Sequence, residues 1–385
     1  MVKRKQNSER RIVYVADLTP QIALALICNV SHLHLPNFRS FLSRHIQFQA
    51  YMNVSQRQEF VLEFHLPHYV LRSDSVRYSD PRRLRVARYF RPPNSSVQDC
   101  IYESQFSLII CVMDDFFWTA YFCADGYYAE RDTVDEYLKE GLDGPSGGQR
   151  PCDMPIWDPR YYFLAVLAIR ISQVTAEWTV LVQALEDYLD PHPESPQTAM
   201  QGEINQSSLP AFLEDDPNLE RTKEYTWILG ILRRLENSLA KLLATWNAFE
   251  MNHRIYFDLD KSGILYDNFR QRFYHIQERT DELQALHMVM EQRIETLEKL
   301  SSTLVNASSL AESITATRQG DNIQLLTRIT IIYLPLTFVT AVFSMNQVPD
   351  DVSWWSYWVS LVFLTTLTVF VAFGFPSLPL VRMGT

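Results

Sequence analysis

Two long apolar stretches near the C-terminal end of the chain constrain its fold more than any other feature. Residues 329–345 and 354–375 contain no charged side chain, and no Lys or Arg occurs between Arg328 and Arg382. A helix needs roughly 20 apolar residues, and at least about 17, to cross the hydrocarbon core of a bilayer. Backbone groups in lipid must be satisfied within each segment, so we expect a hairpin of two transmembrane helices around the polar loop 346–353. The alternative is a helical hairpin buried in a soluble core.

The rest of the chain has the pattern of a soluble protein. It contains 385 residues, and its mean hydropathy is −0.14. Alternation and turn residues predict strands, and Thr19-Pro20 predicts a capped helix start. The predicted strands are 11–19, 60–66, 84–90, 106–113 and 116–123, the last two as a hairpin, and the predicted helices are 21–30 and 36–45. These elements predict an α/β soluble domain.

A helical region follows that domain. A helical pattern covers residues 161–189, and the Pro-rich, acidic segment 191–218 shows no periodicity. Residues 219–256 and 265–318 are again helical, the second without Pro or Gly and with an apolar residue every three or four positions. We expect Gly320 to interrupt this stalk helix. The predicted organisation is therefore an α+β membrane protein: soluble domain 1–190, linker 191–218, helical stalk 219–320 and transmembrane hairpin 321–385.

Composition excludes several classes of function. The net charge of −10 argues against nucleic-acid binding, which relies on Lys and Arg. Five cysteines without a C-x-x-C pair indicate reduced thiols in a cytosol-like compartment and no structural zinc site. We find no P-loop, dinucleotide fingerprint, nucleophile elbow or HExxH motif, so we predict neither an enzyme nor a permanently bound cofactor. Residues 258–263 resemble the start of a calcium loop, but Phe269 replaces its essential Glu.

Charges around the hairpin indicate its orientation. Arg318, Arg328 and Arg382 flank it, whereas the loop between the helices carries only Asp350 and Asp351. The positive-inside rule then places both termini in the cytosol or the mitochondrial matrix. The sequence leaves open whether the membrane is the plasma membrane or the mitochondrial inner membrane. Two helices cannot enclose a water-filled path, so an ion conduit would require several copies of the chain.

The first apolar stretch also carries a recognisable motif. Pro335-Leu336-Thr337-Phe338 lies within it, and Met345-Asn346 closes it. Residues 321–375 resemble the C-terminal part of the CorA-like family of divalent metal transporters, in which Gly-Met-Asn ends the first membrane helix. Here Ser344 stands in place of the Gly. Ser adopts positive φ, and permits close backbone approach, less readily than Gly. The departure raises the question of altered selectivity or lost transport.

The resemblance implies a function and a set of site residues. A homopentamer in the membrane lipid would conduct divalent cations, Mg²⁺ above all, and Asn346 would supply one amide oxygen per subunit to the hydrated ion. Asp350 and Asp351 would concentrate cations at the pore mouth. A row at helical spacing would line the pore, with Leu326 and Leu334 as an apolar gate. This row consists of Ile323, Leu326, Thr330, Leu334, Thr337 and Ala341.

Other interpretations remain open at the level of sequence. Ser344-Met345-Asn346 can be an ordinary helix end, and the pore row can be ordinary helix packing. The chain can be a non-transporting scaffold or sensor anchored by its hairpin, or a transporter of Zn²⁺ or another divalent ion. The loop contains no His or Cys, so we rank Zn²⁺ below Mg²⁺. Soluble acidic residues can form a regulatory metal site, the candidates being Asp187, Asp190, Glu214, Asp215 and Asp216.

Overall fold

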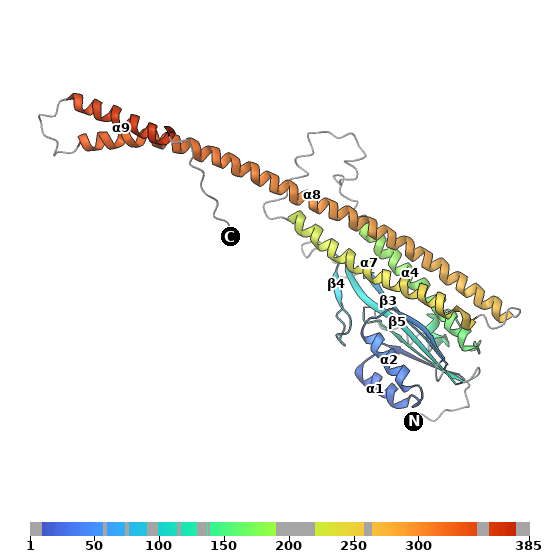
Figure 1. The fold of residues 1–385 in the computed structure, drawn as a ribbon. Helices are drawn as coiled ribbons and strands as arrows, with labels where there is room; N and C mark the ends of the chain where they lie inside the picture. Colours follow the sequence, from blue (N-terminus) through green and yellow to red (C-terminus); the bar gives the residue numbers. More distant parts are fainter. Residues whose placement is uncertain are drawn as a thin grey trace. The chain divides into compact units, whose positions relative to one another are not determined.

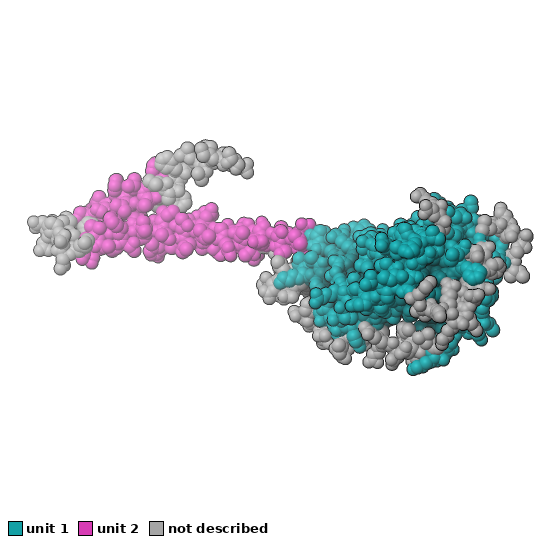
Figure 2. Space-filling model, turned by 90° about the horizontal axis from the view of Figure 1, so that it is seen from below, with its two compact units in different colours: residues 1–302 teal, residues 303–385 magenta. Residues whose placement is uncertain are grey.

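The computed structural model describes most of the chain. The described residues are 10–56, 60–73, 77–90, 99–113, 117–128, 137, 139–189, 220–257, 264–344 and 354–374. They form two compact units, residues 1–302 and residues 303–385, which Figure 2 distinguishes by colour. The predicted linker 191–218 and the calcium-loop resemblance at 258–263 lie outside the described residues. The predicted boundaries at residues 190, 218 and 320 stay predictions.

A mixed sheet of six strands forms the centre of the first unit (Figure 1). The order is β1-β6-β5-β3-β2, with β4 paired to β5. β1 runs parallel to β6, and all other pairs are antiparallel. The strands are β1 Arg10–Ala16, β2 Tyr51–Ser55, β3 Phe60–Arg72, β4 Ala87–Tyr89, β5 Cys100–Val112 and β6 Trp118–Ala124. The mixed α/β character and the hairpin of β5 and β6 are confirmed, whereas β2 was not predicted.

The two faces of the sheet are covered by different helices. Successive side chains of a strand point to opposite faces, and β5 follows this rule. Leu108 and Ile110 pack in the core of α4 (Pro159–Leu189), α7 (Glu220–His253) and the start of α8. Ile109 and Cys111 pack in a second core with α1 (Pro20–Asn29) and α2 (Leu35–Ile46). Figure 1 shows the two helical layers on either side of the sheet.

Local signals placed the helices of the first unit well. Thr19 caps α1, because its side-chain oxygen accepts a hydrogen bond from the Ile22 N–H at 3.3 Å, and Pro20 occupies the first turn as predicted. α4 is apolar on nearly all sides and fully buries Phe163 and Trp178. A helix of this kind belongs in a protein core. α4 packs against β3, and α7 packs beside it on β2 and β3, so both helices cover this face of the sheet.

The longest element is α8, which spans Ile264–Phe343. Leu283, Met290 and Leu297, at intervals of seven residues, are buried in the core of the first unit, as the apolar stripe predicted. Leu304 of the same stripe is also buried, whereas Leu310 is 63% exposed, so the described residues cover the stripe only as far as Leu304. The prediction that Gly320 interrupts the helix was wrong. Gly320 lies within α8, because helix propensity over many residues outweighs the roughly 1 kcal/mol that one Gly costs.

Candidate functional site

Among the described residues, two helices are long and apolar enough to cross a membrane. One is α4, in which 61% of the apolar window is buried, as expected of the core helix described above. The other spans Leu265–Val342 within α8, and only 12% of its apolar window is buried. The apolar surface of this second helix is therefore left largely uncovered by the described residues. The second unit also contains α9, Trp354–Gly374, a helix of 21 residues without a charged side chain.

The predicted pore row lies on an exposed face of α8. Ile323, Leu326 and Leu334 are 64%, 65% and 62% exposed, and Thr330, Thr337 and Ala341 are exposed as well. Pro335 and Val339, on a different face of the same helix, are buried. The row is thus a continuous uncharged surface of exposed side chains, and its last three members also border α9. Such a surface can face other copies of the chain or lipid.

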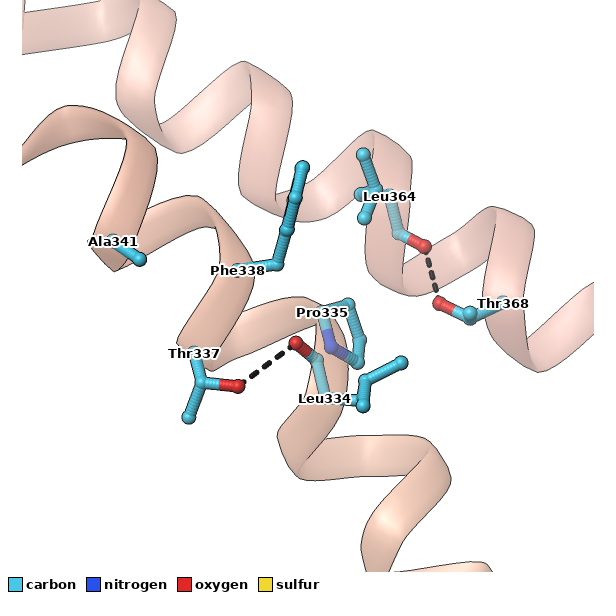
Figure 3. Close-up of a pocket in the computed structure, with 7 residues that line it drawn as sticks. All are labelled: Leu334, Pro335, Thr337, Phe338, Ala341, Leu364 and Thr368. Carbon is cyan, nitrogen blue, oxygen red and sulfur yellow. Dashed lines mark hydrogen bonds between the residues drawn. The ribbon is translucent and has the colours of Figure 1, made fainter.

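Figure 3 shows a cavity of about 600 Å³ between the end of α8 and α9. Pro335 and Phe338 project toward Leu364 of α9, and Leu334, Thr337 and Ala341 complete the α8 side. The hydroxyl of Thr337 donates to the carbonyls of Tyr333 and Leu334, both at 3.0 Å. Thr368 likewise donates to the Leu364 carbonyl. The lining offers apolar surface and hydroxyls committed to the backbone of their own helices, which suits helix packing better than cation binding.

Ser344, the first residue of the Ser-Met-Asn motif, is among the described residues. Its backbone geometry shows whether a Gly is needed at this position. The Ser344 N–H donates to the Thr340 carbonyl at 3.0 Å, so the helical bonding pattern continues to the end of α8. Within the described chain, positive φ at non-glycine residues occurs at Asp17, Phe48 and Arg83, and Ser344 is not among them. A Gly is therefore not required here for backbone conformation. The remaining residues of the predicted mouth, Met345, Asn346, Asp350 and Asp351, lie outside the described residues.

The soluble acidic residues considered for metal binding give no cluster in the described chain. Asp187, on α4, accepts a hydrogen bond from the Gln183 side chain at 3.0 Å. The other four, Asp190, Glu214, Asp215 and Asp216, lie outside the described residues.

Sequence reasoning missed a buried polar network inside the first unit. Its members come from α2, β3, the segment before β4, β5 and the segment after β6: His45, Glu63, His65, Arg85, Gln105, Ser107 and Asp125. No short sequence motif contains network residues from two of these elements. The one local signal that could have found it is His65, because a histidine within an apolar strand requires polar partners.

The hydrogen bonds of the buried polar network form one continuous chain. His65 Nε2 lies 2.8 Å from the Glu63 carboxylate, which accepts, so His65 Nε2 carries the proton. His65 Nδ1 then accepts from Ser107 Oγ at 2.7 Å, and Ser107 Oγ accepts from His45 Nδ1 at 2.8 Å. Both rings are neutral in this arrangement. Burial lowers the pKa of His45 to about 3 and also lowers the pKa of His65, consistent with neutral imidazoles.

Asp125 anchors the charged end of this network. Arg85 Nε donates to it at 2.6 Å and Arg82 Nη1 at 3.0 Å, and the Gln105 N–H adds a third bond. Burial alone would raise the pKa of Asp125, but His45, Arg85 and Arg82 together outweigh burial and hold the pKa below its usual value. The network joins α2 to β3, β5, the segment before β4 and the segment after β6, and it has the character of a structural core.

Comparison with known proteins gives a match in the C-terminal third of the chain. Residues 259–375 match the family model of the CorA-like Mg²⁺ transporter protein. The expected resemblance is thereby confirmed over the segment that contains α8 and α9. No curated protein matches the chain significantly.

Two solved structures are similar at low identity. The full-length CmaX protein is 14% identical, with 94% of this chain and 86% of that chain covered and a TM-score of 0.36. The complete CorA magnesium transporter from Methanocaldococcus jannaschii is 10% identical, with coverages of 94% and 89% and a TM-score of 0.35. The resemblance to the CorA-like family rests on the match over residues 259–375.

Proposed function

We propose that this chain conducts divalent cations, Mg²⁺ first among them, across a membrane, since residues 259–375 match the family model of the CorA-like Mg²⁺ transporter protein. The observation that carries the proposal is the pore row of α8. It is uncharged, exposed and unbroken from Ile323 to Ala341, and it lies in the matched segment. A helix face that is apolar with interspersed Thr, and whose side chains are exposed, suits the wall of a narrow pore.

In this proposal several chains surround one pore. A single pair of helices cannot enclose water, and the family resemblance leads us to propose a homopentamer. The C-terminal part of α8 would line the pore, and α9 would pack outside it through Pro335 and Phe338. Both termini would lie in the cytosol or the matrix, since Arg318 and Arg328 precede the first span and the following loop carries no positive charge.

The transport step in the proposal is passive. Asp350 and Asp351 would raise the local concentration of cations at the mouth. Asn346 amide oxygens would bind the ion with its water shell, because Mg²⁺ gives up water reluctantly. The ion would then pass Leu326 and Leu334, whose apolar rings close the path when water leaves it. The chain supplies selectivity through the ring of amides and control through the apolar rings.

Flux through reconstituted protein tests this function. Purified full-length protein in liposomes with an internal Mg²⁺ indicator should take up Mg²⁺, and Asn346→Ala should abolish uptake or make it unselective. Asn322→Ala, which removes the same amide from α8 at a distance from the mouth, is the matched control and should conduct as the wild type does. Equal Mg²⁺ flux in the wild type, Asn346→Ala and Asn322→Ala would show that Asn346 has no role in conduction.

The departure at Ser344 favours one rival function, a non-transporting anchor or sensor. The geometry of Ser344 weakens that rival, since the described backbone does not require a Gly there. Silent wild-type protein in the same liposomes, reconstituted in the same orientation and amount, would favour the rival.

A further inference from the structure

A second candidate metal site lies within the first unit, between α7 and α8. Glu236 on α7 and His287 and Glu291 on α8 bring one ligand atom each to within 4.8 Å of one another. His287 is only 8% exposed, whereas the Glu291 side chain is 59% exposed. The cluster therefore has a buried nitrogen ligand and a carboxylate that opens to solvent. This arrangement gives an ion a route of entry.

The two ring nitrogens of His287 have different surroundings. Nε2 lies 3.0 Å from Glu236 Oε1, a hydrogen-bond distance, so Nε2–H donates to this carboxylate. A metal-binding imidazole is neutral, and with the proton on Nε2 its Nδ1 is the nitrogen that can bind an ion. It is buried and has no hydrogen-bond partner. A buried acceptor without a partner is unfavourable by about 1–3 kcal/mol and calls for an explanation.

The atom that faces Nδ1 is Glu291 Oε2, at 3.7 Å. This distance is too long for a hydrogen bond, and two acceptors could not form one. It is a separation that two ligands of one ion can have when each lies about 2.0–2.2 Å from it. Positions i and i+4 of a helix share one face, so His287 and Glu291 can chelate an ion without any change in the backbone.

Charges around the cluster also favour a cation. Other acidic residues of these helices pair with Arg or Lys, for example Glu298 with Arg233 and Glu295 with Lys299. Within the described part of the chain, the ion-pair partner of both Glu236 and Glu291 is His287. Within the described residues, neither carboxylate of the cluster forms an ion pair with a Lys or Arg.

We propose that His287 Nδ1 and the Glu291 carboxylate bind a transition-metal cation of the Zn²⁺ class, with water as the remaining ligands. Glu236 is a positioning residue that fixes the ring through Nε2–H, the usual role of a carboxylate behind a metal-binding histidine. An imidazole ligand favours Zn²⁺ over Mg²⁺, which prefers oxygen ligands. The ion at this site thus differs from the proposed cargo, and the inference does not rest on the proposed function.

Zinc competition on the full-length, tag-free protein in detergent tests the proposal. A chromophoric Zn²⁺ indicator should report one tight site per chain, and millimolar Mg²⁺ should not displace the ion. Glu291→Gln, an exposed substitution that leaves the helix packing intact, should abolish tight binding. His287→Ala should do the same, and Glu236→Gln should weaken binding by about 10–100-fold.

Two variants separate this site from general surface binding. Glu295→Gln removes an exposed carboxylate one turn away, and His275→Ala removes a partly exposed histidine from the same helix. Both should bind Zn²⁺ as the wild type does. Absence of tight Zn²⁺ binding by the wild type, or an equal loss in His275→Ala and Glu291→Gln, would overturn the proposal. Co²⁺ substituted at the site should absorb in the visible range, and Glu236→Gln should shift that spectrum.

Discussion

Arg85 Nε donates a hydrogen bond to Asp125 Oδ2 across 2.6 Å, and both side chains are fully buried. The same guanidinium donates to the His45 carbonyl at 2.6 Å, so Arg85 ties the segment before β4 to α2 and to the residue that follows β6. Removal of one partner from a buried ion pair leaves an uncompensated charge, which is destabilising by about 3–5 kcal/mol.

Asp125→Asn should therefore lower the free energy of unfolding of the first unit by about 3–5 kcal/mol. The matched control is Glu298→Gln, which breaks an ion pair with Arg233 in which the side chains are 44% and 61% exposed. Exposed pairs contribute at most about 1 kcal/mol. Chemical denaturation followed by Trp fluorescence measures both. Losses of similar size in the two variants would show that the buried polar network is not a structural core.

Acid should destabilise the first unit before its carboxylates titrate. Burial lowers the pKa of His45 to about 3 and the pKa of His68 to about 4, while an unfolded histidine has a pKa of about 6.5. Below pH 6.5 the unfolded chain binds protons that the folded chain does not, so stability is full above that pH and falls as the pH drops toward 4. Denaturation midpoints at intervals between pH 7.5 and 4.5 test this. His68→Gln should make the slope shallower, and a flat profile would contradict the neutral histidines.

Two glycines should respond in opposite directions to the same substitution. Gly230 lies inside α7, and an added Cβ would meet nothing within 4 Å. Gly230→Ala should raise stability by about 0.5–1 kcal/mol, because Gly loses more backbone entropy in a helix than Ala does. Gly147 has φ +63°, and a Cβ there would lie 2.8 Å from the Gln173 amide nitrogen. Gly147→Ala should lower the thermal midpoint, and a rise would show that this turn relaxes freely.

The proposed gate makes a prediction about polar substitution in the pore row. Leu334→Ser should increase divalent cation flux in liposomes several-fold, since a hydroxyl lowers the cost of wetting an apolar constriction. Leu325→Ser is the matched control, because Leu325 is also exposed, at 58%, but lies outside the row. A larger increase from Leu325→Ser than from Leu334→Ser would place the gate on another face of α8.

Local sequence patterns predicted many of the helices and strands, but they did not predict which distant strands pair. The Thr19 cap, the hairpin of β5 and β6, and α4 each follow from neighbouring residues and were predicted. β2 was missed because five residues with a central Asn show too little alternation. The pairing of β1 with β6 joins residues more than a hundred positions apart, such as Arg10 and Trp118, and no local signal encodes it.

In the candidate site too, features set by neighbouring residues were predicted and features set by distant contacts were not. Spacing alone placed Leu326 and Leu334 on one face of α8, and their exposure agrees with that face being open. The buried polar network was not predictable, because His45 and Ser107 meet only when α2 folds onto the sheet. The pairing of Glu236 with His287 likewise depends on the register between α7 and α8. The predicted interruption at Gly320 was wrong, because the helix-forming residues on both sides of it outweigh the cost of a single Gly.

The most direct test of the central claim is Mg²⁺ flux by the wild-type protein, measured beside Ser344→Gly in liposomes of matched protein content. The account predicts that the wild type conducts Mg²⁺ and that Ser344→Gly conducts at a similar rate, since Ser344 holds an ordinary helical hydrogen bond to Thr340. A silent wild type with flux restored by Ser344→Gly would contradict it, and would identify a transporter fold that has lost its pore function.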